Sequence, residues 1–259
     1  MFLTFLRGAV TVTFVASTVL VCAVVAQSPV PQSVATVLNT AVGAHGGEAL
    51  RGLRTYSEDA LINATVLGVG VYNLRFRTTV DFTTQRGRIE IFSNGTLQTI
   101  YQLTPQGARF WTPKDGTKPA TAPVKPDAPF TFSTPVKAGV LGLLAVGKAS
   151  DETLSSDANT EIQGVRGASI KREAKTYQAT YVFDKSGALA VERTVLIDAK
   201  GDKTEFTLVY DAFKTLNGVR IPTHAKIYSS QIPGYASADL TVTAVAVNPT
   251  LAANAFEMP

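Results

Sequence analysis

The sequence predicts a mainly β protein with a few helices, in which about eleven strands form one curved antiparallel sheet. Three observations predict this fold class. Apolar and polar residues alternate through most of the chain, and short glycine-containing turns separate the alternating segments. Two further segments predict helices, one from apolar residues at helical spacing and one from its length and leucine content. Because strands joined by short turns pair antiparallel, we expect a half-barrel wrapped around an N-terminal amphipathic helix and a central apolar helix.

The alternation is clearest between Val71 and Phe82. Side chains along a strand point in turn to two opposite faces, so each parity defines one face of the sheet. The apolar parity contains Tyr72, Leu74, Phe76, Thr78, Val80 and Phe82. The polar parity contains Asn73, Arg75, Arg77, Thr79 and Asp81. The segment therefore predicts a sheet with one apolar face and one face in water.

The first 26 residues resemble an export signal. Arg7 is the only charge before an uncharged run from Gly8 to Ala26, and Val24-Val25-Ala26 places small residues before a cleavage site. We expect cleavage after Ala26 and an exported, periplasmic or otherwise extracytoplasmic protein. Two alternatives stay open, namely an anchor formed by residues 8–26 and a lipid-modified Cys22.

We expect the remaining chain to form a single folded domain over residues 27–259, and its length would also permit two small ones. Cys22 is the only cysteine, so the mature chain has neither a disulfide nor thiol chemistry, and its stability depends on an apolar core. The formal net charge of +4 is spread over both signs without a basic stripe, which argues against nucleic acid as a partner.

The first helix is predicted to follow Ser33, which can cap it. Its apolar stripe consists of Val34, Val37, Leu38, Ala41 and Val42, and the glycines from Gly43 to Gly47 end it. The predicted strands are Arg54–Val66, Val71–Phe82, Arg88–Ser93, Thr96–Leu103, Gly107–Thr112, Thr160–Arg172, Tyr177–Phe183, Leu189–Ile197, Thr204–Phe213, Val219–Ser229 and Ala238–Val247.

Three segments interrupt the alternation in the middle of the chain. Residues 112–129 contain five prolines and predict a polar surface loop. Thr134–Lys148 is rich in leucine and valine and predicts the central apolar helix, which three glycines weaken. We expect this helix to be a displaceable lid, and an ordinary core helix is the alternative. Asp151–Asn159 predicts a second polar loop.

Motifs of catalysis are missing from the sequence. It contains no Gly-x-Ser-x-Gly, no His-Glu-x-x-His and no phosphate-binding loop, and its only histidines are His45 and His224. Glu58 and Asp59 are adjacent on a predicted strand, so they point to opposite faces, and we interpret both as solvated charges. We therefore predict no catalytic residue, no metal site and no cofactor, and keep an enzyme as the third hypothesis.

Two parts of the chain resemble a known family. The entry to the sheet is Ala44–Leu50, with the sequence AHGGEAL, and its exit begins at Leu216–Pro222, with the sequence LNGVRIP. Val245–Asn248 closes the last strand, and Leu251 and Phe256–Pro259 follow it. These residues resemble the outer-membrane lipoprotein sorting protein family, whose members include a periplasmic lipoprotein carrier and its lipid-anchored acceptor.

The resemblance implies a half-barrel with an apolar cavity for acyl chains and a strand arginine that holds a lid. Which arginine of this chain has that role stays open at this point. The chain is longer than a minimal carrier, and Cys22 lacks the small residue that lipid modification needs directly before it. The lack of that small residue before Cys22 argues against the lipid-anchored acceptor.

The leading hypothesis is an extracytoplasmic binder or carrier of acyl chains from lipids or lipoproteins. An interaction or sensor module of the same fold is the alternative, with envelope membrane proteins as further candidate partners, and we expect a monomer. A cavity between sheet and helices would be lined by the apolar residues Tyr72, Leu74, Phe76, Phe82, Ile89, Ile91, Leu97, Tyr101, Leu141, Leu144, Tyr181 and Phe183. A packed core without a ligand is the competing interpretation of the same set.

Overall fold

The computed structural model describes residues 32–66, 70–104, 107–113, 122–123, 139–147, 152–175, 177–197, 200–229 and 238–258. The predicted export signal with Cys22, most of the proline-rich loop, and residues 134–138 and 148 of the predicted lid lie outside the described residues. No helix within the ranges above is long and apolar enough to cross a membrane.

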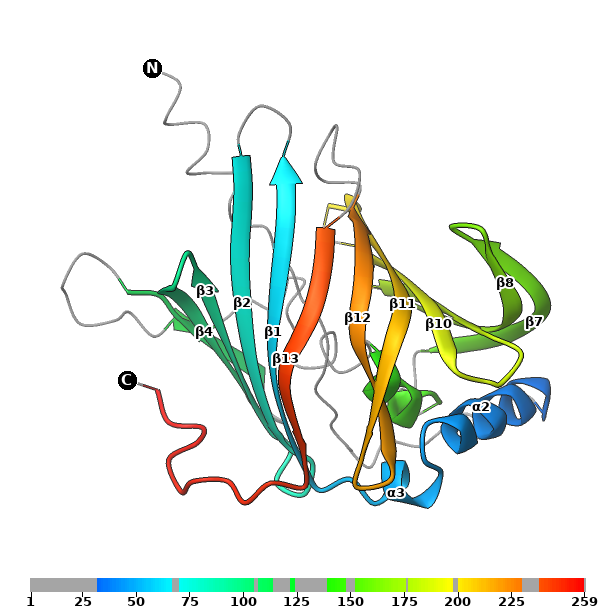
Figure 1. Cartoon of the computed structure of the whole chain (residues 1–259), viewed down its shortest axis with the longest axis horizontal. Helices are drawn as coiled ribbons and strands as arrows, with labels where there is room; N and C mark the ends of the chain where they lie inside the picture. The colour runs from blue at the N-terminus through cyan, green and yellow to red at the C-terminus, as the bar shows by residue number, and fades with distance from the viewer. Residues whose placement is uncertain are drawn as a thin grey trace.

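One antiparallel sheet dominates the molecule and curves around its own interior (Figure 1). Among the described residues, thirteen strands lie in the order β6-β5-β4-β3-β2-β1-β13-β12-β11-β10-β9-β8-β7. The first half of the chain joins the second where β1 pairs with β13. In the described part of the chain, no pairing joins the end strands β6 and β7, and the sheet is open there. The strands are β1 (Thr55–Val66), β2 (Gly70–Asp81), β3 (Arg86–Ser93), β4 (Thr96–Thr104), β5 (Gly107–Trp111), β6 (Ala122–Pro123), β7 (Thr153–Ile162), β8 (Val165–Ala174), β9 (Tyr177–Phe183), β10 (Leu189–Ile197), β11 (Lys203–Leu216), β12 (Val219–Ser229) and β13 (Ala238–Val247).

Each of the eleven predicted strands has a counterpart, and β6 and β7 are additions. The prediction of a polar loop at Asp151–Asn159 is wrong, because most of it belongs to β7. The predicted strand Thr160–Arg172 is instead the end of β7, a turn and most of β8. Gln163 and Gly164 form that turn, both with positive φ, which suits a two-residue hairpin. β7 is an edge strand with polar, exposed residues, so it lacks the apolar parity by which the other strands are found.

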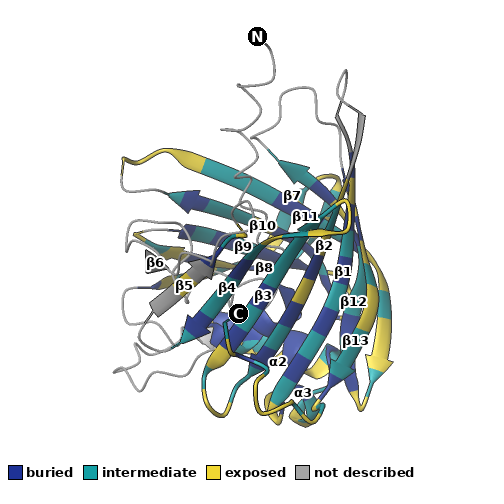
Figure 2. Ribbon diagram, turned by 90° about the vertical axis from the view of Figure 1, so that its left-hand side faces the viewer, coloured by how far each residue is buried: buried dark blue, intermediate teal, exposed yellow. Residues whose placement is uncertain are grey.

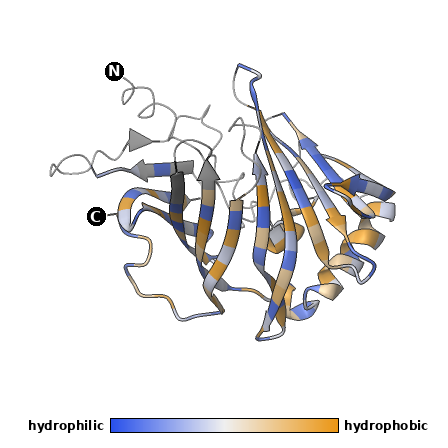
Figure 3. Ribbon diagram, turned by 45° about the horizontal axis from the view of Figure 1, so that its top comes forward, coloured by the Kyte–Doolittle hydropathy of each residue, from blue (hydrophilic) through white to orange (hydrophobic). Residues whose placement is uncertain are grey.

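Burial follows the predicted parity along β2. Phe76, Thr78 and Val80 are buried, whereas Arg75 and Arg77 are exposed. Figure 2 shows buried and exposed residues alternating along the strands, and Figure 3 shows the matching alternation of hydropathy. We call the side of Phe76 the inner face and the side of Arg77 the outer face. The inner face carries the apolar core.

Two helical segments precede the sheet. The amphipathic helix α2 (Gln32–Ala44) is confirmed, and the short α3 (Glu48–Arg51) follows it. α2 packs against β7 and β8, beside one end of the sheet (Figure 1). It therefore packs at the β7–β8 end of the half-barrel and leaves the centre of the inner face to other residues.

The prediction of one central apolar helix is wrong for the described residues. Only α4 (Gly139–Gly142) and the 3-10 turn η2 (Leu143–Ala145) form in this region, and Val146 and Gly147 follow in non-helical backbone. Gly139, the first residue of α4, and Gly147 have φ of 63° and 74°, values outside the right-handed helical region. Gly139 and Gly147, which the sequence analysis expected to weaken the central helix, therefore mark the two ends of the helical turns in the structure.

His45 connects the helical entry to the sheet. Its Nδ1 lies 2.7 Å from the Arg220 carbonyl oxygen, and the Leu189 amide donates to its Nε2 at 2.9 Å. These two backbone partners require the neutral ring, protonated at Nδ1. Gly46 contacts the turn before β12 so closely that a Cβ atom there would lie 2.1 Å from the Gly218 oxygen. The two segments that carry the family resemblance thus contact each other and form the base of the half-barrel.

We predict a large difference between the two faces of β2. Phe76→Ala should lower the free energy of unfolding by about 3–5 kcal/mol, because the ring is buried in the core. Arg77→Ala should cost under about 0.5 kcal/mol, because Asp59 keeps Arg75 and Glu90 keeps Arg88 as partners. Denaturant titration measures both, and equal small losses would contradict the assignment of faces.

We also predict that His45 makes the fold sensitive to acid. Burial lowers the pKa of His45 from 6.5, so the unfolded chain binds a proton more readily. The stabilisation by neutral His45 is present above about pH 6.5 and is lost as the pH falls below it. The difference in unfolding free energy between wild type and His45→Gln should shrink by up to about 1.4 kcal/mol per pH unit. His224→Gln is the matched control, and an unchanged difference down to pH 5 would contradict the prediction.

Candidate functional site

A short apolar segment fills the inner side of the curved sheet. Residues 139–147, which we call the inner segment, comprise α4, η2 and the two residues after them. Val140, Leu141, Leu143 and Val146 are buried in the same core as the inner face of the strands, and Leu144 packs against that core. The inner segment therefore occupies the space in which the sequence predicts a ligand cavity.

Arg172 on β8 binds the middle of the inner segment through its backbone. Its guanidinium donates to the carbonyl oxygens of Gly142 at 3.2 Å and Ala145 at 3.1 Å. It also forms an ion pair with Glu152 at 2.7 Å, and both side chains are fully buried. Arg172 shares the inner face with Ile170, so strand alternation directs its charge into the core.

Two buried carboxyl groups bind the two ends of the inner segment. At its start, the Gly139 amide donates to Glu192 Oε2 at 2.5 Å. At its end, the Gly147 amide donates to Glu152 Oε2 at 3.1 Å. Tyr210 donates to Glu192 at 3.1 Å, and the Tyr177 hydroxyl donates to Glu152. We call Arg172, Glu152 and Glu192 the clamp, because together they hold the start, middle and end of the inner segment.

The electrostatics of the clamp follow from its burial. Burial opposes the charge of Arg172, but Tyr181, Tyr177 and Glu152 raise its pKa above the usual range, so it stays protonated. Burial raises the pKa of Glu192 above its usual value, against the lowering effect of its hydrogen bonds. Burial also raises the pKa values of Tyr177, Tyr181 and Tyr210, which remain neutral. Tyr177 and Tyr210 donate to the buried carboxyl groups, and the Tyr181 hydroxyl accepts a hydrogen bond from Arg172 at 3.3 Å.

Glu58 corrects the interpretation of the Glu58-Asp59 pair as two solvated charges. The two residues do point to opposite faces, but Glu58 is buried on the inner face, where the Tyr56 hydroxyl donates to it. Burial raises the pKa of Glu58 to about 7. Asp59 lies on the outer face, where hydrogen bonds from Arg75 lower the pKa of its carboxyl group.

Most of the residues predicted to line a cavity lie in one core with the inner segment. Leu97 is half-buried and lies apart from this core, and the side chain of Tyr72 is outside the described residues. The buried members are Phe76, Ile89, Leu141, Tyr181 and Phe183, and the partly buried members packed against the core are Leu74, Phe82, Ile91, Tyr101 and Leu144. Whether these side chains contact a ligand stays a prediction.

The sequence interpretation missed all three members of the clamp. Arg172 had a usable signal, because it is a charged residue at the parity of Ile170 and Ala168 on a predicted strand. Glu192 had none, because a register shift between Leu189 and Val191 disturbs the parity of β10. Glu152 falls in the segment that was predicted to be a loop.

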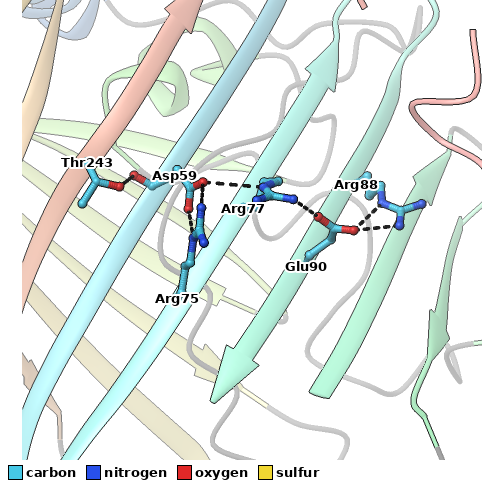
Figure 4. Close-up of polar contacts among 6 residues, drawn as sticks. All are labelled: Asp59, Arg75, Arg77, Arg88, Glu90 and Thr243. Carbon is cyan, nitrogen blue, oxygen red and sulfur yellow. Dashed lines mark hydrogen bonds and ion pairs between the residues drawn. The ribbon is translucent and has the colours of Figure 1, made fainter. Parts of the chain in front are cut away.

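The outer face carries a separate, ionic arrangement. Asp59, Arg75, Arg77, Glu90 and Arg88 form a chain of ion pairs across β1, β2 and β3 (Figure 4). The C-terminal tail, residues 248–258, crosses this face. Arg88 donates to the Glu257 carbonyl oxygen, and Gln102 donates to that of Phe256 at 2.5 Å. Between tail and sheet lies an open groove of about 710 Å³.

Both histidines have partners within the fold. Both ring nitrogens of His45 are hydrogen-bonded to backbone groups. His224 lies on the outer face of β12, where its Nδ1 is 2.5 Å from Asp211 Oδ1. Among the described residues, no group of three or more His, Cys, Asp or Glu side chains could hold a metal ion.

We predict that the clamp depends on its ion pair. Arg172→Met should lower the free energy of unfolding by about 3–5 kcal/mol, because it leaves Glu152 buried without its cation. Arg172→Met with Glu152→Gln should recover part of this loss. Arg166→Ala is the control on the same strand, where an exposed ion pair with Glu161 contributes at most about 1 kcal/mol. Similar losses for the two single arginine variants in urea titrations would contradict the clamp.

No family model and no curated protein matches this sequence. Solved structures are nevertheless similar to it. A DUF1329 family protein from Desulfovibrio piger has a TM-score of 0.59 at 11% identity, covering 88% of this chain and 98% of that chain. A candidate outer membrane lipoprotein-sorting protein domain from Vibrio parahaemolyticus has a TM-score of 0.56 at 11% identity, covering 85% and 95%. A LolA superfamily protein from Nitrosomonas europaea has a TM-score of 0.56 at 10% identity, covering 86% and 97%. The chain therefore has the fold of LolA superfamily and lipoprotein-sorting proteins.

Proposed function

We propose that this protein binds and carries an acyl-chain ligand outside the cytoplasm, and that the ligand takes the place of the inner segment. The single observation that carries the proposal is the inner segment itself. It is apolar and buried, yet it has only two short helical turns, α4 and η2, and is bounded by Gly139 and Gly147. The proposal is for binding without catalysis.

The energetics of exchange support an acyl chain. A buried methylene group contributes roughly 0.8 kcal/mol, so a chain of about twelve methylenes could replace the burial of Leu141, Leu143 and Leu144. The inner segment is joined to the sheet by the clamp and by side-chain packing, and none of its residues belongs to a strand. Moving it out would therefore break few of the hydrogen bonds between strands.

Arg172 fits the strand arginine that the family resemblance implies. Its side chain lies on the inner face of β8 and donates to two carbonyl oxygens of the inner segment. The fold of the lipoprotein-sorting proteins adds a precedent for the architecture, while the cargo of this chain is a proposal. Lipid or lipoprotein acyl chains are the proposed ligand class.

The outer-face groove favours a second candidate function. A partner protein could lie between the C-terminal tail and the ionic chain of Asp59, Arg77 and Glu90, as expected for an interaction or sensor module. Charge-reversal at Arg77 would weaken such an association and leave acyl-chain binding unchanged. The buried inner segment favours the first candidate.

We predict that palmitic acid displaces the inner segment. Adding it at pH 7.4 should speed amide hydrogen exchange at Val140–Val146 by at least about tenfold. Amide exchange should slow in the strands that surround the ligand. Native mass spectrometry should show one palmitate bound per chain. Slow exchange at these residues that palmitate does not change would identify an ordinary core segment and refute the proposal.

A pair of leucine variants sharpens this test. Leu141→Ala should tighten palmitate binding, because it removes buried apolar contacts from the closed state that the ligand must replace. Leu61→Ala on the outer face of β1 is the control and should leave the affinity unchanged. Weaker binding by Leu141→Ala would show that Leu141 contacts the ligand rather than competing with it.

A further inference from the structure

The clamp belongs to a larger group of polar side chains on the inner face of β8, β9 and β10. Tyr181 lies at its centre, because its hydroxyl is 3.3 Å from the Arg172 guanidinium and its cross-strand partner on β10 is Glu192. Tyr177 and Glu152 extend the group beside Arg172. All five side chains are buried, and we call them the polar patch.

The other half of the sheet presents mainly apolar side chains to the same interior. Phe76 on β2, Ile89 on β3 and Leu103 on β4 belong to the core in which the inner segment is buried. The inner segment matches both surfaces, because its side chains are apolar and its backbone forms hydrogen bonds with the polar patch. A ligand that replaces it must therefore be amphipathic as well.

The inner segment offers hydrogen-bonding groups of both kinds to the polar patch. The carbonyl oxygens of Gly142 and Ala145 accept from Arg172, and the amides of Gly139 and Gly147 donate to the two buried carboxyl groups. Displacing the segment removes two acceptors and two donors at once. A purely apolar chain would replace none of them, and each buried group left without a partner weakens binding.

The charges of the polar patch argue against an anionic headgroup. Within the described ranges, Arg172 is the only lysine or arginine that is buried, and Glu152 is already paired with it at 2.7 Å. A ligand carboxylate would be a further acid beside this one cation, with Glu192 on the far side of Tyr181. A neutral carbonyl group would instead replace the backbone carbonyl groups without changing the charge of the interior.

We propose that the polar patch is a headgroup subsite that selects a neutral acyl ligand with both carbonyl and hydroxyl groups, of which a monoacylglycerol is the simplest. This inference rests on the proposed function, since it concerns the ligand of the same site. The ester carbonyl oxygen accepts from Arg172, and the glycerol hydroxyls donate to Glu192 and Glu152. The acyl chain lies against the apolar inner face of β2, β3 and β4.

Three ligands with the same acyl chain test the subsite. 1-Palmitoylglycerol carries acceptors and donors, methyl palmitate carries acceptors alone, and palmitate carries an anionic acceptor. Each competes at pH 7.4 with a fluorescent acyl probe, below the concentration at which it aggregates. We expect 1-palmitoylglycerol to bind at least about tenfold more tightly than either of the others. Equal affinity for palmitate or for methyl palmitate would overturn the subsite.

Infrared spectroscopy tests the hydrogen bond to Arg172. When its ester carbonyl carries carbon-13, bound 1-palmitoylglycerol should show a carbonyl stretching band at lower frequency than the same lipid in hexane. The reason is that the guanidinium donates charge-assisted hydrogen bonds to the carbonyl oxygen. A band at the hexane position would contradict the subsite.

A glutamine variant tests the acceptor half of the subsite. Glu192→Gln keeps the size of the side chain and leaves one acceptor oxygen, so the preference for 1-palmitoylglycerol over methyl palmitate should fall by at least about threefold. Glu173→Gln is the control, because Glu173 follows Arg172 on β8 and is exposed on the outer face. It should keep the full preference, and an unchanged preference in Glu192→Gln would contradict the subsite.

The same titrations separate this inference from the proposed function. If all three ligands bind with similar affinity, the headgroup subsite is wrong and the proposed function stands. If none of the three binds to wild type or to Leu141→Ala, the proposed function itself is wrong.

Discussion

The burial of Arg172 is the constraint on which the interior of this protein depends. A guanidinium group inside an apolar core is tolerated only with full hydrogen bonding and a compensating charge. Glu152 supplies the charge, and the backbone of the inner segment supplies two carbonyl oxygens. The segment that fills the half-barrel is thus held by polar bonds, although its side chains are apolar. Removing it from the interior would leave Arg172 with fewer acceptors, which favours the closed state.

Different interactions hold the wall of the half-barrel and the inner segment within it. The strands are joined by a continuous ladder of backbone hydrogen bonds, and the entry helices are attached to the sheet through His45 and the close contact between Gly46 and Gly218. The inner segment has no strand ladder, and the clamp and side-chain packing alone attach it to the sheet. We therefore expect lower local stability at the centre of the apolar interior than in the wall around it.

Strand alternation made most of the sheet predictable from sequence, and it failed where its physical basis is weak. β2 shows the success, because Phe76 and Val80 must avoid water while Arg75 and Arg77 must reach it. β7 shows the failure, because an edge strand can be polar on both faces and then resembles a loop. The central helix was predicted from the length and leucine content of Thr134–Lys148, whereas the positive φ angles of Gly139 and Gly147 confine it to two short turns. The clamp was missed for another reason. Its members are far apart in sequence, and only the curvature of the sheet brings Glu152, Arg172 and Glu192 to one segment.

The polar edge strand has a consequence for the behaviour of the protein in solution. An open sheet exposes unpaired backbone groups at its ends, and such edges can recruit strands from other molecules into growing aggregates. β7 carries exposed Ser155, Asp157 and Asn159, and its register with β8 breaks between Asp157 and Thr160. An incoming strand would meet a charge and an irregular hydrogen-bonding pattern at this edge. We therefore expect the polar residues that made β7 resemble a loop in the sequence to hinder half-barrels from joining end to end into a fibre.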